Sequence, residues 1–224
     1  MDNMIVSVNP HVYAKDTTQT IMRDVLIALF PAVIASIVFF GVQALLVEVV
    51  CVATAMACEW AFEKICRKPI TVMDLSAAVT GLILALNLPV EIPLWQAMFG
   101  SFVAIIVIKQ FFGGIGQNFA NPAITARVIM LVAFAGTMTT WAPAAFSNAP
   151  ADAVTAATPL AIIASGEGEL PTLAQMFLGA RGGSMGETSC LALLLGGIYL
   201  IYRRVISWHT PVAFIGTVLV CTAL

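Results

Sequence analysis

Residues 25–62 read VLIALFPAVIASIVFFGVQALLVEVVCVATAMACEWAF, and this stretch decides the fold class. It holds two apolar runs, 25–42 and 44–62, in which the only charged residues are Glu48 and Glu59. Each run approaches the roughly 20 residues that a helix needs to cross a bilayer. Of the 224 residues in the chain, 60% are hydrophobic and 10% are charged, against about 45–50% and 25% in soluble domains. The sequence therefore predicts an all-α polytopic membrane protein.

Further apolar segments follow, so about seven transmembrane helices are expected in all. Several are short and interrupted, because Asn87-Leu88-Pro89 ends the third and Asn121-Pro122 precedes the fifth. Non-helical backbone at membrane depth is tolerated only inside protein or beside a wet cavity, so these broken helices indicate interior sites. The later segments cover residues 72–88, 94–112, 127–141, 189–203 and 210–224.

Two glycine-rich turns, GGIGQN at 113–118 and GGSMGE at 182–187, occupy matching places along the chain. Interrupted helices in matching places are typical of internal repeats in transporters. The first turn is expected on the cytoplasmic side of the membrane and the second on the outer side, which predicts an inverted repeat of a five-helix unit. The second copy would hold only two helices, so we expect the sequence to be a fragment of a longer protein.

The positions of lysine and arginine predict which side of the membrane each loop faces. With a cytoplasmic N-terminus, nine of the ten Lys and Arg residues fall on the inner side and only Arg181 falls outside. The start of the chain lacks an apolar core with a small-residue cleavage site, so it is not a secretory signal. We expect a cytoplasmic segment at 1–24, a five-helix unit at 25–141, an extracytoplasmic loop at 142–188 and the start of a second unit at 189–224.

Charge and cysteine patterns disfavour other classes of protein. A net charge of -2 without a dense basic run gives no electrostatic footprint for nucleic acid. The five cysteines include no C-x-x-C pair, which disfavours zinc and iron–sulfur sites. We expect them to fill apolar packing positions, with no metal bound.

One motif in the long loop points to chemistry, and it reads DAVTAATPL over residues 152–160. It resembles the flavinylation site of the family that contains RnfD and NqrB, the latter a membrane subunit of the sodium-pumping NADH:quinone oxidoreductase. In that family an aspartate precedes a Ser/Thr-Gly-Ala-Thr core, and the last threonine carries FMN through a phosphoester. Thr158 matches this acceptor, although Ala156 stands where glycine is expected and Thr155 where serine is usual. The alternative interpretation is an ordinary Ala/Thr-rich helix start before Pro159.

Other segments carry the same resemblance, which extends over residues 9–211. It implies a membrane electron-transfer subunit of an ion-translocating ferredoxin:NAD oxidoreductase (Rnf) complex in the bacterial cell membrane, where electron flow is coupled to Na+ or H+ movement. The implied partners are the other Rnf subunits (membrane, flavoprotein and iron–sulfur) and a flavin transferase, and a second, non-covalent riboflavin is expected among the interior turns. The matching segments are NPH at 9–11, IMRDV at 21–25, FGGIGQNFANPA at 112–123, RGGSMGETS at 181–189 and ISWH at 206–209.

Alternative functions stay open on the sequence. The short N-terminal arm favours the ferredoxin-linked complex, because NqrB of the quinone-linked complex is expected to carry a longer extension. Broken helices and inverted repeats are equally typical of a small-solute channel or transporter. A purely structural scaffold within a membrane complex is the third candidate.

Three polar residues are candidates for site roles beside Thr158. Arg181 is a candidate partner of the flavin phosphate through charge-assisted hydrogen bonds, or a simple surface residue. Glu187 is a candidate flavin contact or a capping carboxylate. Asp74 opens the third apolar segment, and an intramembrane carboxylate indicates an ion path by default. Its alternative role is to cap the helix that follows.

For the remaining candidates, an ordinary structural role competes with a functional one. His11 is a candidate proton or cofactor contact, but a lone histidine on a polar arm is more often a surface or capping residue. Glu48 and Glu59 lie in the second apolar segment and face either a wet path or the lipid headgroups.

Overall fold

The structure is a computed structural model that describes residues 17–145, 158–166 and 170–223. Within these ranges it is helical and contains no strand, which confirms the all-α fold class. The α-helices are α1 Thr18–Phe40, α2 Val42–Ile65, α3 Ser76–Leu86, α4 Leu94–Phe102, α5 Pro122–Ala133, α6 Ala135–Met138, α7 Pro159–Ser165, α8 Leu173–Leu178, α9 Cys190–Tyr202 and α10 His209–Ala223. A 3-10 turn, η1 (Val72–Asp74), precedes α3, and a π-helix, η2 (Val103–Gln110), continues α4.

Helices α1 and α2 are long and apolar enough to cross a membrane. They have 23 and 24 residues with mean hydropathies of 2.1 and 1.8, and only 22% and 28% of their most apolar windows are buried in the bundle. Helices this apolar whose sides are left uncovered are suited to lipid rather than to water. The other apolar helices are shorter, and the fold is that of a membrane protein.

Helix α1 begins at Thr18, earlier than the expected residue 25. The reason is a capping box: the side chain of Thr17 accepts the backbone N–H of Thr20, and the Thr20 hydroxyl accepts the N–H of Thr17. This pairing satisfies donors that the first turn of a helix leaves free. Gly41, with φ 74°, ends the helix and reverses the chain into α2.

Helix α3 is a short helix buried among the others. Ten of its 11 residues are buried, and its length of about 17 Å is little more than half of a bilayer core. At Gly81 an added Cβ would lie 2.9 Å from the Cys51 carbonyl oxygen and from Cβ of Ala55, so the two backbones of α2 and α3 pack closely. Asn87 ends α3 inside the protein, which confirms that the third segment is a broken helix.

The fifth segment differs from the expected 127–141. The Asn121 side chain accepts the N–H groups of Ala123 (3.0 Å) and Ile124 (3.3 Å), and Pro122 occupies the first helical turn, so α5 begins at 122. The α-helix stops at Ala133, because Phe134 has φ -130° and ψ 45°. The prediction of one helix over 127–141 was therefore wrong, since the cap at Asn121 was interpreted only as a break.

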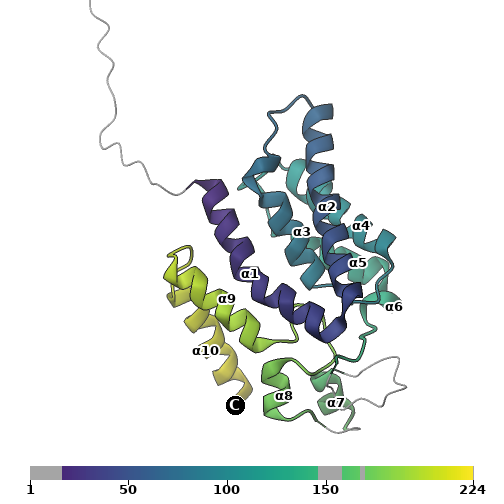
Figure 1. Ribbon diagram of the computed structural model, residues 1–224, viewed down its shortest axis with the longest axis vertical. Coiled ribbons are helices and arrows are strands. Elements are labelled where there is room, and N and C mark those ends of the chain that lie inside the picture. Colours follow the sequence, from purple (N-terminus) through teal and green to yellow (C-terminus); the bar gives the residue numbers. More distant parts are fainter. Residues whose placement is uncertain (1–16, 146–157, 167–169, 224) are drawn as a thin grey trace, which may run out of the picture.

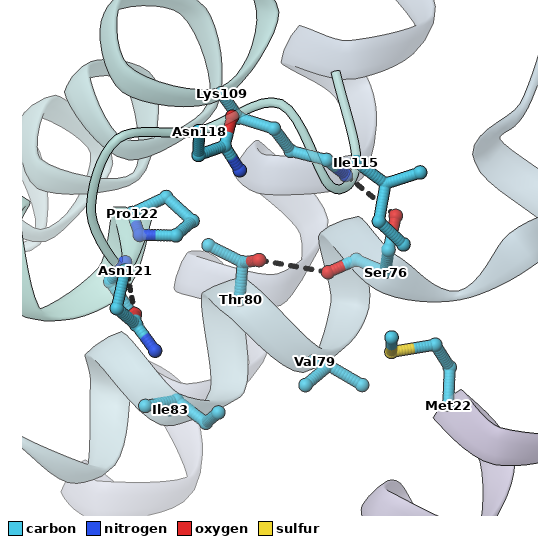
Figure 2. Close-up of a pocket in the computed structure, with 11 residues that line it drawn as sticks. Met22, Ser76, Val79, Thr80, Ile83, Lys109, Ile115, Asn118, Asn121 and Pro122 are labelled. Carbon is cyan, nitrogen blue, oxygen red and sulfur yellow. Dashed lines mark hydrogen bonds between the residues drawn. The ribbon is translucent and has the colours of Figure 1, made fainter. Parts of the chain in front are cut away.

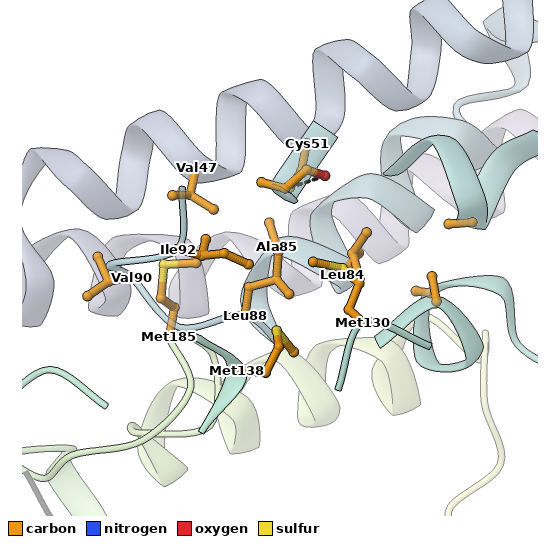
Figure 3. Packing of buried hydrophobic residues seen from close by; sticks show 14 of the residues in the cluster. Val47, Cys51, Leu84, Ala85, Leu88, Val90, Ile92, Met130, Met138 and Met185 are labelled. Carbon is orange, nitrogen blue, oxygen red and sulfur yellow. Dashed lines mark hydrogen bonds between the residues drawn. The ribbon is translucent and has the colours of Figure 1, made fainter. Parts of the chain in front are cut away.

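The apolar core lies where α2, α3, α5 and the second glycine-rich turn meet (Figure 3). Val47 and Cys51 of α2 face Leu84 and Leu88 around the end of α3, and Met185 from the turn inserts beside them. Met185 is 1% exposed. The turn at 182–187 is thus part of the core rather than a surface loop.

Helix α9 packs against α1 on the side away from α4 and α5 (Figure 1). An added Cβ at Gly196 would overlap the carbonyl oxygen of Ala28, so glycine permits this close approach. Arg203, which caps the end of α9, pairs with Asp24 near the start of α1 at 3.1 Å, and the Tyr199 hydroxyl donates to the same carboxylate at 3.2 Å.

Candidate functional site

A network of polar side chains lies within the bundle, at the end of α3 that follows η1. The Lys109 ammonium lies 2.5 Å from Oε1 of Glu59 and donates to Oγ of Ser76 at 2.6 Å. Ser76 donates its backbone N–H (2.7 Å) and its hydroxyl (2.5 Å) to Oδ1 of Asp74. Gln110 donates its amide to Glu59 Oε1 at 2.9 Å. Side chains from α2, α3, η1 and η2 therefore form one connected network.

Apart from the half-buried Asp74, the members of this network are buried. The side chains of Lys109 and Glu59 are 3% and 1% exposed, and Oε2 of Glu59 has no hydrogen-bond partner among the described residues. One helical turn further along α2, Glu63 is also buried and accepts the backbone N–H of Thr71 at 3.0 Å and the Thr71 hydroxyl. Because charges are expensive to bury in a membrane protein, they indicate a functional site by default.

The π-helix explains why two consecutive residues reach the same carboxylate. In η2 a backbone N–H donates to the carbonyl five positions earlier in the chain, as the Phe111 N–H does to the Ile106 carbonyl at 3.0 Å. The wider turn reduces the angle between neighbours, so Lys109 and Gln110 both face Glu59. Such π-helical turns occur frequently at functional sites.

Backbone strain lies next to this network as well. Leu75 has φ 65°, in the left-handed region that a residue with a branched side chain rarely adopts. It turns the chain between η1 and α3, which places the Asp74 carboxylate against Ser76. Strain of this kind tends to cluster at functional sites.

A cavity opens beside Lys109 at the first glycine-rich turn (Figure 2). It encloses about 150 Å³ within an open hollow of about 480 Å³. Its polar lining comes from three places: the start of α3, the end of η2 and the turn before α5. The lining residues with polar side chains are Ser76, Thr80, Lys109, Asn118 and Asn121.

The second glycine-rich turn forms another polar hollow at the opposite end of α3. Arg181 donates from its guanidinium to the Glu187 carbonyl at 3.0 Å, while the Ser184 hydroxyl donates to the Glu187 carboxylate at 2.9 Å. The buried Nε of Arg181 has no partner among the described residues. A cavity of about 260 Å³ is lined there by Asn87, Ser184 and Glu187 among apolar side chains.

Thr158 is the N-cap of α7, and its side chain accepts the Ala161 N–H at 3.3 Å. Residues 152–157, which carry the rest of the motif, lie outside the described residues, as does His11. In the part of the chain that the structure describes, no hydrogen bond joins Thr158 to Arg181 or Glu187.

The structure separates the candidate residues into two groups. Arg181 and Glu187 meet in the second turn, while Asp74 lies at the other end of α3 in the Lys109 network. Asp74 does bond the first N–H of α3, as a capping residue would, but the Ser76 hydroxyl also ties it to Lys109. Glu59 is buried in the protein, which is inconsistent with the headgroup position, one of its two expected alternatives.

Sequence reasoning missed the roles of Lys109 and Arg127. Both were counted among the positive residues at the membrane boundary, but Lys109 is buried against Glu59, and Arg127 donates to the Asn87 carbonyl at 3.1 Å at the end of α3. A signal was present for Lys109, because it lies inside the apolar segment 94–112, where a cation needs an internal partner. Arg127 begins the segment expected at 127–141, so its position gave no such signal.

Comparison with known proteins assigns this chain to a family. The family model NQR2, RnfD, RnfE matches residues 5–224. The chain belongs to this family. It is 45% identical over 225 residues to the D-subunit of the Na(+)-translocating ferredoxin:NAD(+) oxidoreductase complex of Acetobacterium woodii, covering 99% of this chain and 70% of that protein.

Two further relatives are also similar to this chain. The D-subunit of the proton-translocating ferredoxin:NAD(+) oxidoreductase complex of Clostridium ljungdahlii is 42% identical, over 97% of this chain and 68% of that protein. The D-subunit of the ion-translocating oxidoreductase complex of Rhodobacter capsulatus is 37% identical, over 96% and 68%. These relatives carry names for different ions at similar identity, so the degree of identity alone does not select the ion.

Proposed function

We propose that this chain is a flavin-carrying electron-transfer subunit of an ion-translocating ferredoxin:NAD oxidoreductase complex in the cell membrane. The observation that carries the proposal is the 45% identity, over nearly the whole chain, to the D-subunit of such a complex. The names of the relatives favour this function over a solute channel and over the quinone-linked complex. The chain would act only with partner subunits that supply and accept electrons.

Thr158 is proposed as the acceptor of covalent FMN. The residue fits the group: the threonine is half-buried at the start of a short surface helix, and among the described residues its hydroxyl oxygen accepts only a long 3.3 Å bond from Ala161. A flavin transferase would join this oxygen to the flavin phosphorus, with loss of the hydroxyl proton. The attached flavin supplies the redox chemistry, while protein groups position it.

Arg181 and Glu187 are proposed to position the flavin from the second glycine-rich turn. The guanidinium of Arg181 keeps its Nε free of any partner among the described residues, so it retains a donor for a phosphate oxygen. Glu187 orients this arginine through its backbone carbonyl and is itself held by Ser184.

The cavity beside Lys109 is proposed as the place for a non-covalent riboflavin among the interior turns. The Asn121 amide nitrogen can donate to a polar ring edge, whereas its oxygen caps α5. The Asn118 amide oxygen can accept, since its nitrogen faces backbone carbonyl oxygens, and Met22 and Ile83 supply apolar contacts. The half-buried carboxylate of Asp74 would belong to the ion path, which it joins through Ser76 and Lys109.

The proposed topology has seven crossings and an inverted repeat, with the N-terminus in the cytoplasm and the Thr158 loop outside. The ion pair between Asp24 near the start of α1 and Arg203 at the end of α9 supports this topology, because it brings these two helix ends to the same end of the bundle. The end of α2, with Lys64, Arg67 and Lys68, leads directly into η1, which contacts α1. The positive-inside rule assigns this end to the cytoplasm.

The test is covalent flavin on the denatured subunit. Coexpressed with its flavin transferase, the wild-type chain should show a fluorescent band on a denaturing gel, and Thr158→Ala should lose it. Thr172→Ala is the matched control, because Thr172 caps α8 in the same way that Thr158 caps α7. A band that persists in Thr158→Ala, or that disappears in Thr172→Ala alone, would contradict the assignment of the acceptor.

A further inference from the structure

The turn that follows α2 carries a cluster of cations that no acid of the chain neutralises. Lys64, Arg67 and Lys68 are exposed, and none of them forms an ion pair with a described residue. The two acids of the same region bond within the protein, Glu63 to the turn itself and Asp74 to the start of α3. The surface at this end of α2 therefore has an excess of positive charge.

Arg67 adopts a backbone conformation that favours glycine, since its φ is 53°. The Lys68 N–H donates to the Glu63 carbonyl at 2.8 Å and closes the end of the helix, as in a Schellman motif. The left-handed position of this motif is usually glycine, because a side chain there is strained. Helices α7 and α8 follow that rule and end at Gly166 and Gly179, both left-handed. Helix α2 departs from it by placing an arginine there.

No contact within the described part of the chain offsets this strain. The Arg67 side chain is exposed and forms no hydrogen bond or ion pair with a described residue. The dipole of a helix favours cations at its C-terminus, but Lys64 and Lys68 already occupy that position. A strained residue indicates function when the protein itself gives it no other reason. The guanidinium of Arg67 is therefore expected to bind a group outside the chain.

The turn that carries the cations is anchored at both ends. The buried carboxylate of Glu63 accepts the Thr71 backbone N–H at 3.0 Å and the Thr71 hydroxyl, which closes residues 63–71 into a loop. Within this loop Pro69 has a fixed φ. Because the backbone is held in this way, less conformational entropy is lost when the cations bind an anion.

Aromatic and apolar side chains place the cations at the level of the membrane surface. The Lys64 ammonium lies 4.6 Å from the centre of the Trp60 ring, and the Lys68 ammonium lies 5.1 Å from that of Phe62. Trp60 is 46% exposed and Ile65 is 80% exposed. A tryptophan near the end of a membrane helix is typical of the headgroup region. Charged and apolar groups are therefore exposed side by side at this helix end.

We infer that the end of α2 binds an anionic phospholipid, whose phosphate is held by Lys64, Arg67 and Lys68 and whose acyl chain lies against Trp60 and Ile65. Guanidinium and ammonium groups bind phosphate oxygens through charge-assisted hydrogen bonds. Basic residues next to a membrane helix attract anionic lipids. The exposed Ile65 favours a lipid over an acidic soluble protein, because the lipid offers an apolar chain beside its charge. The site is separate from both cavities of the glycine-rich turns and does not depend on the flavin.

The first test is thermal unfolding of the full chain in mild detergent, with and without added phosphatidylglycerol. At about ten times its Kd, this lipid should raise the Tm of the wild-type chain by roughly 3–6 °C, whereas phosphatidylcholine should not. Arg67→Gly removes the cation and the backbone strain together. It should therefore raise the Tm in detergent alone and lose most of the gain from phosphatidylglycerol. An Arg67→Gly variant that keeps the full gain would overturn the inference.

Arg204→Gly is the matched control for the first test. Arg204 has φ 58° at the end of α9, where the Val205 N–H donates to the Leu200 carbonyl at 3.0 Å, so the substitution relieves the same kind of strain. Its neighbour Arg203 is paired with Asp24, so that turn lacks the cluster of three cations. The variant should gain Tm in detergent and keep its response to phosphatidylglycerol. If it loses that response as Arg67→Gly does, the effect is one of general surface charge and the site is wrong.

The second test locates the lipid through the fluorescence of Trp60. The other tryptophans are first replaced by phenylalanine, namely Trp95, Trp141 and Trp208. Brominated phosphatidylglycerol should then quench Trp60 at a concentration about tenfold lower than brominated phosphatidylcholine does. Lys64→Gln and Lys68→Gln should each reduce this difference. Equal quenching by the two lipids, or displacement of the lipid by inorganic phosphate at the same concentration, would overturn the inference.

The third test distinguishes a lipid from a protein as the occupant of the site. A photo-crosslinking residue at Ile65, in the complex purified through a tag on this chain, should label phospholipid, identified by mass spectrometry. Labelling of a partner polypeptide alone would show that a protein covers the end of α2 and would overturn the inference.

Discussion

The pair of Glu59 and Lys109 is the residue-scale feature that most constrains this bundle. Its members are almost fully enclosed, and Lys109 also holds Ser76 and thereby Asp74. A buried ion pair contributes little net stability compared with apolar residues of the same size, but removal of one partner leaves an uncompensated charge. The pair therefore fixes the relative positions of α2, α3 and η2.

The buried Glu59–Lys109 pair predicts that the stability losses of its two single variants are not additive. Glu59→Gln or Lys109→Met alone should lower the free energy of unfolding by about 3–5 kcal/mol, while the double variant should recover much of that loss. The measurement is a denaturant titration of the purified chain in micelles. Lys64→Met, at an exposed lysine one turn from Trp60, should change it little. Additive losses in the double variant would show that the two residues act independently.

Contacts between helices in this protein depend on glycine at specific positions, and α9 offers a matched pair. An added Cβ at Gly196 would overlap the Ala28 carbonyl of α1, whereas one at Gly197 would meet nothing within 4 Å. Gly196→Ala should destabilise the chain by about 1–3 kcal/mol through overpacking. Gly197→Ala should be neutral or stabilising by up to about 1 kcal/mol, because alanine favours a helix. Thermal unfolding in detergent compares the two, and equal shifts would argue against the α1–α9 contact.

Elements with a repeated local pattern could be predicted from the sequence, whereas elements defined by distant partners could not. The apolar runs of α1 and α2 and the break at Asn87 follow from composition and turn chemistry. The π-helix at 103–110 does not, because its extra residue is accommodated by contacts with Glu59 on another helix. For the same reason Lys109 was assigned to the membrane boundary, since its partner is 50 residues away in the sequence.

At the scale of the whole molecule, the two glycine-rich turns lie at opposite ends of the buried helix α3. The first lines the cavity that includes Ser76, and the second contacts the last turn of α3, where the Gly186 N–H donates to the Leu86 carbonyl at 2.7 Å. In the proposed topology the first turn faces the cytoplasm and the second turn faces the outer side. The proposed flavin sites would then lie toward opposite faces of the membrane.

This arrangement predicts opposite accessibility of the two ends of the bundle. Cys66, exposed at the end of α2, should resist a membrane-impermeant maleimide in intact cells and react after the cells are opened. A thiol introduced by Ser165→Cys, at the exposed end of α7, should react in intact cells. Cys190 and Cys221, the other exposed cysteines, are replaced by alanine so that the two signals can be read separately. Reaction of Cys66 from outside, with protection of the thiol at 165, would reverse the topology and place the Thr158 loop in the cytoplasm.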